Sequence, residues 1–257
     1  MSFSYSETRI EELLSEFTSP HVREAVELSA LPGILDQTDY FIDVGANVGL
    51  YTFHAAKHLR RAKILAIEAN PYLIPALRKT VENLRGDDAS ENEYEIVEGA
   101  VSDIPGSLEF HVSKFPTLSS IFPHETATAV TVPTLCLDDF YRPSVRTVVK
   151  IDVEGAEHRV MRTASRFLTA RGARFFVELH GWGDKTIGRY PIHLCWLFVV
   201  NGYALRKIGT HYLFQRAAWP KRWGSFLRQC PYLGVKYLVF RYTPGLLPLL
   251  RRMRSKT

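Results

Sequence analysis

Short apolar runs and amphipathic helical patterns alternate along most of this chain. The runs hold four to six residues, a length that suits strands buried in a parallel sheet. They span residues 40–44, 63–67, 94–97, 147–151 and 174–179. Apolar residues at helical spacing lie at 50–59, 74–84, 160–168 and 192–200. The alternation predicts an α/β domain with a mostly parallel sheet and helices on both faces.

Three stretches depart from this alternation. Residues 10–32 show helical spacing alone, which predicts an N-terminal helical extension. Residues 103–140 are interrupted by Pro and Gly, which predicts hairpins or loops that cover part of a site. Residues 203–208 and 211–215 predict a closing antiparallel hairpin. We therefore expect a helical extension at 1–35, an α/β domain at 36–216 and a C-terminal extension at 217–257.

The turn after the first predicted strand reads DVGANVG and has the composition of a cofactor-binding loop. Gly45 and Gly49 let the backbone approach a ligand, and the next helix offers unpaired N–H groups. Asp43, at the strand tip, would repel a pyrophosphate and attract the charged amino group of S-adenosylmethionine (SAM). Glu68, which ends the second predicted strand, is placed to accept hydrogen bonds from a ribose.

A second group of polar residues follows the next two strands of the pattern. Asp152 lies at the end of one, and Glu178 and His180 share one face of the other. Ligands of open α/β sheets bind beyond the carboxyl ends of the strands, so we expect one shared crevice. His180 is the first candidate for a general base near neutral pH, and Asp152 is the second. Glu154 and Glu178 would orient either one.

Simpler interpretations of this group stay open. His180 is equally consistent with a structural hydrogen bond to a neighbouring acid. Glu157 is more typical of a charge that stabilises the start of a helix than of catalysis. Several carboxylates converge here, but no ligand spacing requires a metal ion, and we expect none.

Seven motifs along residues 39–181 make the chain similar to the FkbM-type SAM-dependent methyltransferases. They are DVGANVGLYT, AIEANP, EGAVSD, TLSS, TLCLDDF, KIDVEGAE and VELH, in the family's order. Many methyltransferases share the first motif. The combination of KIDVEGAE with VELH is much more specific to this family.

This resemblance implies the class I methyltransferase fold, a Rossmann-like and mostly parallel sheet of seven strands, with SAM as cofactor. It also implies methyl transfer to oxygen, usually to a hydroxyl of a sugar or a polyketide. Gly45, Asn47 and Gly49 would lie against the methionine part of SAM, and Glu68 would hold the ribose. The residues expected to flank the adenine are Val101, Ser102 and Asp103.

Charge is divided unevenly along the chain. The net charge is +5, but 14 Lys and Arg residues and no acid follow Asp184. Trp219, Trp223, Phe226 and Leu227 recur there at helical spacing among basic residues, as in helices that lie at a membrane surface. Contact with an anionic membrane, capture of a polyanionic substrate and packing onto the domain all stay open. No nucleic-acid-binding motif is found, and we expect no such partner.

Other features of the composition concern the compartment. The cysteines are few and far apart, which indicates reduced thiols: Cys136, Cys195 and Cys230. The first residues are polar, unlike a signal peptide, and no run approaches the roughly 20 apolar residues of a spanning helix. We expect a cytoplasmic protein, either free or peripheral at the inner face of a membrane.

The sequence thus favours an O-methyltransferase that acts on a sugar, a glycolipid or a similar small acceptor. A nicotinamide-dependent oxidoreductase is a second hypothesis. The missing third glycine of the dinucleotide fingerprint and the acid at Asp43 argue against it. A membrane-associated scaffold that has lost catalysis is a third, and the intact loop with its two acids argues against that.

Overall fold

The computed structural model describes residues 5–15, 24–86, 89–115, 118–123, 127–180 and 191–229. Its helices are α1 (Glu7–Ser15), α2 (Ala25–Ile34), α3 (Leu50–His58), α4 (Ile74–Gly86), α5 (Glu157–Arg162), α6 (Ser165–Thr169) and α7 (Pro191–Val200). Its strands are β1 (Tyr40–Val44), β2 (Lys63–Glu68), β3 (Glu93–Glu98), β4 (Ala100–Val101), β5 (Ser107–Val112), β6 (Thr128–Leu135), β7 (Thr147–Ile151), β8 (Ala173–Glu178), β9 (Tyr203–Ile208) and β10 (His211–Arg216).

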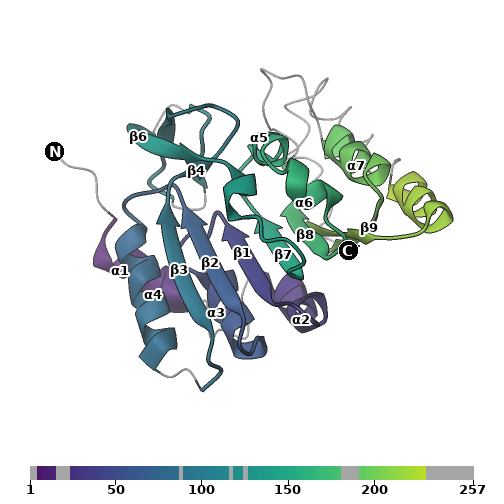
Figure 1. Ribbon diagram of the computed structural model, residues 1–257. Coiled ribbons are helices and arrows are strands. Elements are labelled where there is room, and N and C mark those ends of the chain that lie inside the picture. Colours follow the sequence, from purple (N-terminus) through teal and green to yellow (C-terminus); the bar gives the residue numbers. More distant parts are fainter. Residues whose placement is uncertain are drawn as a thin grey trace, which may run out of the picture.

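Seven of these strands form one central sheet in the order β3-β2-β1-β7-β8-β10-β9 (Figure 1). The strands from β3 to β8 pair in parallel, and β10 is antiparallel to both of its neighbours. Parallel strands need a crossover connection, which the helices between them supply. The predicted α/β architecture with a seven-stranded, mostly parallel sheet and a closing hairpin is confirmed.

Helices cover both faces of the sheet because alternate strand residues point to opposite sides. Ile42 and Val44 of β1 pack on the side that α5, α6 and α7 cover. Phe41 of the same strand packs on the other side, with α2 and α3. Both faces of β1 are therefore buried, which accounts for its continuous apolar run.

A second sheet lies beyond the end of the central one and has the order β4-β6-β5. Strands β5 and β6 pair antiparallel as a hairpin, and β4 pairs in parallel with β6 directly after β3 ends. The hairpin expected from the Pro and Gly pattern at 103–140 is confirmed. It brings Phe110 and the segment at 118–121 to the edge where the parallel strands end.

The prediction of a single helix at 160–168 was wrong, because the chain forms two short helices there, α5 and α6. The Thr163 hydroxyl donates to the Val160 carbonyl oxygen at 2.7 Å and accepts the Leu137 N–H at 3.0 Å. The Asp138 carboxylate accepts the Arg166 N–H at 2.9 Å and so caps a new helix start. Polar contacts with the preceding segment thus divide the helix.

The C-terminal extension is helical over residues 219–229 and packs on α7. Trp223 and Phe226 join the core cluster of the α5–α7 face, while Trp219 and Leu227 stay 63% and 64% exposed. Of the four apolar residues that recur at helical spacing, two therefore pack on the domain and two face solvent. Within the described ranges, no helix has the length and apolarity needed to cross a bilayer.

Candidate active site

A cavity of about 610 Å³ opens where the parallel strands end. Its walls come from the tips of β1, β2, β7 and β8, the turn between β9 and β10, the hairpin segment at 118–121 and Leu13 of α1. Each parallel strand ends at this edge, so residues far apart in the sequence meet there. The arrangement is the crevice that open α/β sheets use for ligands.

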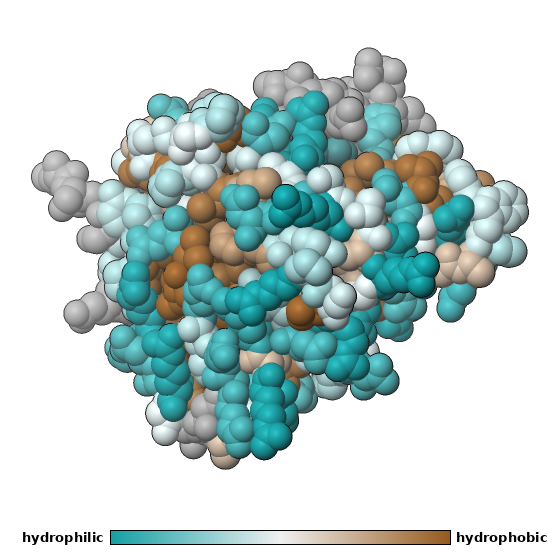
Figure 2. Space-filling model, viewed as in Figure 1, coloured by the Kyte–Doolittle hydropathy of each residue, from teal (hydrophilic) through white to brown (hydrophobic). Residues whose placement is uncertain are grey.

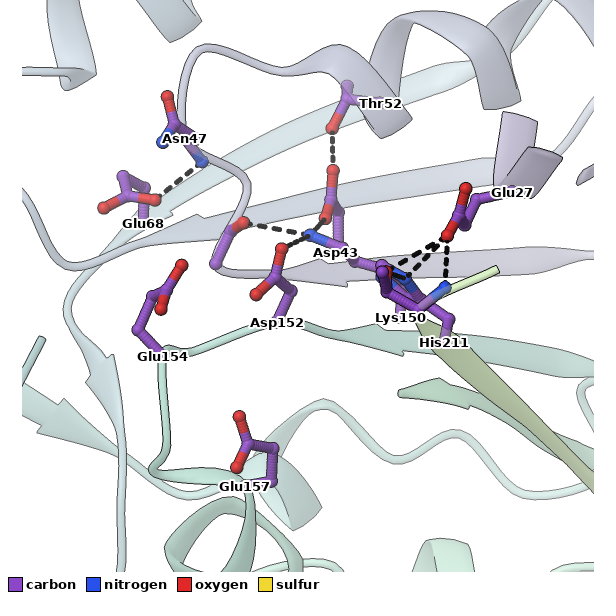
Figure 3. Close-up of polar contacts among 12 residues, drawn as sticks. Glu27, Asp43, Asn47, Thr52, Glu68, Lys150, Asp152, Glu154, Glu157 and His211 are labelled. Atoms are coloured by element: carbon purple, nitrogen blue, oxygen red, sulfur yellow. Dashed lines mark hydrogen bonds and ion pairs between the residues drawn. The ribbon is translucent and has the colours of Figure 1, made fainter. Parts of the chain in front are cut away.

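The glycine loop after β1 forms one wall of the cavity. Gly45 has φ 77° and Gly49 has φ 96°, in the left-handed region where glycine costs least. A Cβ on Gly45 would overlap the Asp152 carbonyl oxygen, so the loop rests directly on the turn after β7. Glu68 accepts the Asn47 N–H at 2.7 Å and thereby fixes the loop against the tip of β2 (Figure 3). Its other oxygen accepts the Asn70 N–H, also at 2.7 Å.

Beneath this loop, Lys150 joins β1 to β7 through a buried group of ion pairs. Its Nζ lies 3.3 Å from Asp43 Oδ1 and 3.6 Å from Asp152 Oδ2, and donates to the Gly45 carbonyl oxygen at 3.1 Å (Figure 3). Burial opposes the charge on Lys150, but the two carboxylates outweigh it and raise the pKa of this amine. Thr52 donates to the other oxygen of Asp43 at 2.8 Å.

A cluster of acids around His180 forms the adjoining wall. The His180 Nδ1 lies 2.7 Å from Glu157 Oε1, and its Nε2 lies 3.3 Å from Glu154 Oε2. One ligand atom each of Asp152, Glu178 and His180 lies within 4.8 Å of the others. Carboxylate and imidazole groups are donors that divalent cations accept, so this set can hold a metal ion.

Burial and mutual repulsion shift the pKa values of this cluster apart. Burial and then the charge of Asp152 raise the pKa of Glu178 to about 7. Burial also raises the pKa of Glu154 to about 8, although His180 opposes it. Burial disfavours the charged form of His180, but Glu157, Asp152 and Glu154 together outweigh burial and raise the pKa of His180 to about 10. Burial opposes ionisation of Asp152 too, yet Lys150 and His180 together with weaker contributions hold its pKa below the ordinary value.

Backbone geometry also sets Glu154 apart. Its φ of 51° lies in the left-handed region, which a residue with a Cβ enters at a cost. Gly155 follows with φ 98°, and Gly155 N–H donates to Glu157 Oε1 at 3.0 Å. This tight turn aims the Glu154 carboxylate into the cavity, which it lines.

The cavity brings together eight of the twelve residues expected from the sequence. Those that line it are Gly45, Asn47, Glu68, Val101, Asp152, Glu154, Glu178 and His180. Asp43, expected to meet the cofactor, is fully buried, and its carboxylate is held by Lys150 and Thr52. Asp43 can therefore act on a ligand only through the loop and Lys150.

Gly49, Ser102 and Asp103 also lie outside the residues that line the cavity. Gly49 starts α3, where it packs against α4. Asp103 turns toward α5 and accepts hydrogen bonds from Arg159 at 3.1 Å and Arg162 at 2.6 Å. Of the expected adenine-flanking segment, only Val101 lines the cavity.

Five polar residues that line the cavity were not among the expected site residues: Glu24, Tyr51, Ser119, Lys150 and Thr210. Lys150 carried a readable signal, because a lysine inside an apolar strand run requires buried partners. Glu24 precedes α2, Tyr51 lies in the first turn of α3, and Thr210 lies in a hairpin turn. Glu24 and Thr210 lie in no motif, and the motif DVGANVGLYT contains Tyr51 but assigns it no role. Only the folded chain brings the three together.

Comparison with known families gives one match across this site. A family described as "Methyltransferase FkbM domain" matches residues 43–204, from the tip of β1 to the start of β9. No curated protein sequence matches the chain.

Solved structures resemble the chain at low sequence identity. An O-methyltransferase from Bacillus cereus in complex with SAH is 10% identical with a TM-score of 0.45, covering 81% of this chain and 90% of its own. An SAH-bound Podospora anserina methyltransferase, PaMTH1, is 9% identical with a TM-score of 0.45, over 84% of this chain and 91% of its own. The B. subtilis tRNA methyltransferase TrmK is 10% identical with a TM-score of 0.45, covering 89% of this chain and 82% of its own. Likeness at this level says nothing about what the chain binds.

The buried ion pairs of Lys150 generate a first prediction. Lys150→Met leaves Asp43 charged and buried without its partner, so we expect a loss of about 3–5 kcal/mol in the free energy of unfolding. The double variant Lys150→Met/Asp43→Asn should recover more than half of that loss, because it removes the uncompensated charge. Chemical denaturation followed by circular dichroism measures both.

Lys79→Met, on the exposed side of α4, is the matched control and should change stability by less than about 0.5 kcal/mol. An equal effect of Lys79→Met and Lys150→Met would show that the Lys150 ion pairs do not stabilise the fold.

Proposed function

Because the chain belongs to the FkbM methyltransferase family, we propose that it transfers the methyl group of SAM to a hydroxyl of a sugar, a glycolipid or a similar small acceptor. Membership makes the protein a SAM-dependent methyltransferase of class I fold. The family leaves both other hypotheses, the nicotinamide-dependent oxidoreductase and the silent scaffold, without support. The hydroxyl acceptor is the part that we propose.

One observation carries the proposal, namely that the cavity has two chemically distinct sides. The side formed by Gly45, Asn47 and Glu68 presents backbone and one carboxylate, as a nucleoside cofactor needs. The side formed by Asp152 and Glu178 presents acids that accept hydrogen bonds. A hydroxyl held by those acids would lie beside the cofactor's methyl group, and methyl transfer depends above all on such positioning.

On the cofactor side we propose that Glu68 binds the ribose hydroxyls. Two backbone N–H groups already use one site on each of its oxygens. A carboxylate has about four acceptor sites, so it retains capacity for a ligand. Gly45 and Asn47 would approach the methionine part of SAM, and Val101 would pack beside the adenine.

On the acceptor side, the proton of the hydroxyl must leave as the new bond forms. His180 was the first candidate from the sequence, but its raised pKa of about 10 keeps it protonated at neutral pH. Glu178 and Glu154, with pKa values raised to about 7 and about 8, are better matched to proton transfer near neutral pH. We therefore propose these carboxylates as proton acceptors, and His180 as the positive charge that positions them.

We also propose that the C-terminal extension brings the protein to an anionic membrane surface, where a glycolipid acceptor would lie. Figure 2 shows apolar residues gathered over α7, beside the helix of residues 219–229. Trp219 and Leu227 of that helix are exposed, and Lys221 and Arg228 accompany them. Exposed apolar anchors among basic residues favour binding to anionic lipid.

Methyl transfer itself gives the direct test. With methyl-labelled SAM and fractionated glycans and glycolipids, we expect label in a methyl ether, identified by mass spectrometry. Gly45→Ala should abolish transfer, because its side chain would overlap the Asp152 carbonyl oxygen. Gly106→Ala is the matched control, since Gly106 also has a positive φ but nothing near its added Cβ. Label found only on nitrogen would refute the hydroxyl acceptor.

The pH profile of turnover distinguishes the proton acceptors. A base works only when deprotonated, so turnover should rise with pH through the pKa of the acting group. If Glu178 and Glu154 act, turnover rises between about pH 7 and 8 and then levels off. If His180 acts, turnover continues to rise towards pH 10, and that result would show that His180 is the base.

Vesicle binding tests the membrane proposal. The full chain should sediment with phosphatidylglycerol vesicles at low salt, and salt should weaken this binding because it screens exposed charge over about 10 Å at 0.1 M. Trp219→Ser/Leu227→Ser should reduce binding several-fold, whereas Val26→Ser, also exposed and apolar, should not. Wild-type protein that stays in the supernatant would contradict the proposal.

A further inference from the structure

The tips of β7 and β8 place two carboxylates and an imidazole around one point in the cavity. One ligand atom each of Asp152, Glu178 and His180 lies within 4.8 Å of the others. We infer that these three side chains bind a divalent cation, Mg²⁺ or Mn²⁺, which holds the acceptor by two adjacent oxygens. The inference rests on the proposed function and specifies how the same site would hold its acceptor.

Unsatisfied polar atoms in the same cavity are a further sign of a ligand. Asp152 Oδ1 is buried and makes no hydrogen bond of good geometry among the described residues. The hydroxyl of Tyr51, a residue only 3% exposed that lines the same cavity beside Glu24, makes no hydrogen bond of good geometry in the described part of the chain. Buried polar atoms without partners are costly, and a cation with its bound water would satisfy them.

The contacts of His180 orient it as a ligand. Glu157 is buried and lies 2.7 Å from the His180 Nδ1, where it can accept a proton held on that nitrogen. A bound cation would displace the second proton, which His180 otherwise holds at neutral pH, and leave the lone pair of a neutral ring on Nε2, the nitrogen nearer Glu154. A histidine that binds a metal commonly donates its other N–H to a carboxylate in this way.

The donor set favours a hard divalent ion. Two carboxylates and a neutral imidazole carry charge −2, which a dication balances. Lys150 offsets only part of that charge, because it is shared between Asp152 and Asp43. Oxygen-rich sets with one imidazole suit Mg²⁺ and Mn²⁺, and three protein ligands leave coordination positions for water and for an acceptor.

A cation here would activate the hydroxyl directly. As a Lewis acid it lowers the pKa of a bound hydroxyl. The O–H bond then breaks and its proton passes to Glu154, which lines the cavity outside the ligand set. The oxygen's electron pair forms the bond to the methyl carbon, and the carbon–sulfur bond returns its pair to sulfur. SAM thereby becomes a neutral thioether, and no other reactant is needed.

Mn²⁺ provides the test, because its paramagnetic signal reports the free ion. The full chain, first dialysed against EDTA, should reduce the free Mn²⁺ signal with one site per chain and a Kd in the micromolar range. Glu178→Gln and His180→Gln should each weaken binding by about 10-fold or more. Glu91→Gln removes an exposed acid that pairs with Arg61 and should change nothing.

Circular dichroism and SAM calorimetry on every variant separate loss of the site from loss of the fold. A wild-type chain that binds SAM but leaves the Mn²⁺ signal unchanged would overturn the inference and leave the proposed function standing. Unchanged Mn²⁺ affinity in Glu178→Gln would also overturn it. Mn²⁺ binding together with methyl transfer to nitrogen would refute the hydroxyl acceptor and the cation's role in holding it, and would leave only the cation site.

Discussion

The charge of Lys150 is the constraint on which the site depends. It lies between two strands and compensates two carboxylates that could not otherwise stay ionised in a buried position. The same amine donates to the Gly45 carbonyl oxygen, so it also ties the glycine loop to the sheet. One ammonium group therefore sets both the position of the proposed cofactor wall and the ionisation of Asp152 on the adjoining wall.

This arrangement makes the cavity strongly acidic in a protein whose net charge is positive. Repulsion among Asp152, Glu154 and Glu178 is relieved in part by His180, which carries the charge that these acids favour. A site with this excess of carboxylates favours ligands rich in donors or in positive charge. The basic C-terminal extension at 217–257 lies outside the family match, so the two kinds of charge belong to separate parts of the chain.

The sequence was most informative where local pattern alone decides structure. Buried strands such as β1 appear in the sequence as continuous apolar runs. The glycine turn after β1 is recognisable from the seven residues DVGANVG. The division of α5 from α6 was not visible, because it depends on Asp138, which is distant in sequence. Ligand spacing likewise could not reveal a cluster built from two strand tips. Glu24 lies in no motif, and the motif that contains Tyr51 assigns it no role, so the presence of both in the cavity is visible only in the folded chain.

The backbone of Glu154 has a consequence for how this position can vary. Its left-handed conformation would be adopted more easily by glycine or asparagine, so the backbone gains nothing from a glutamate here. Random drift at this position would therefore run toward those smaller residues unless the carboxylate itself were selected. Among relatives that keep the same turn, a glutamate here would indicate that the carboxylate is still needed for catalysis, and a glycine would indicate that this need has been lost.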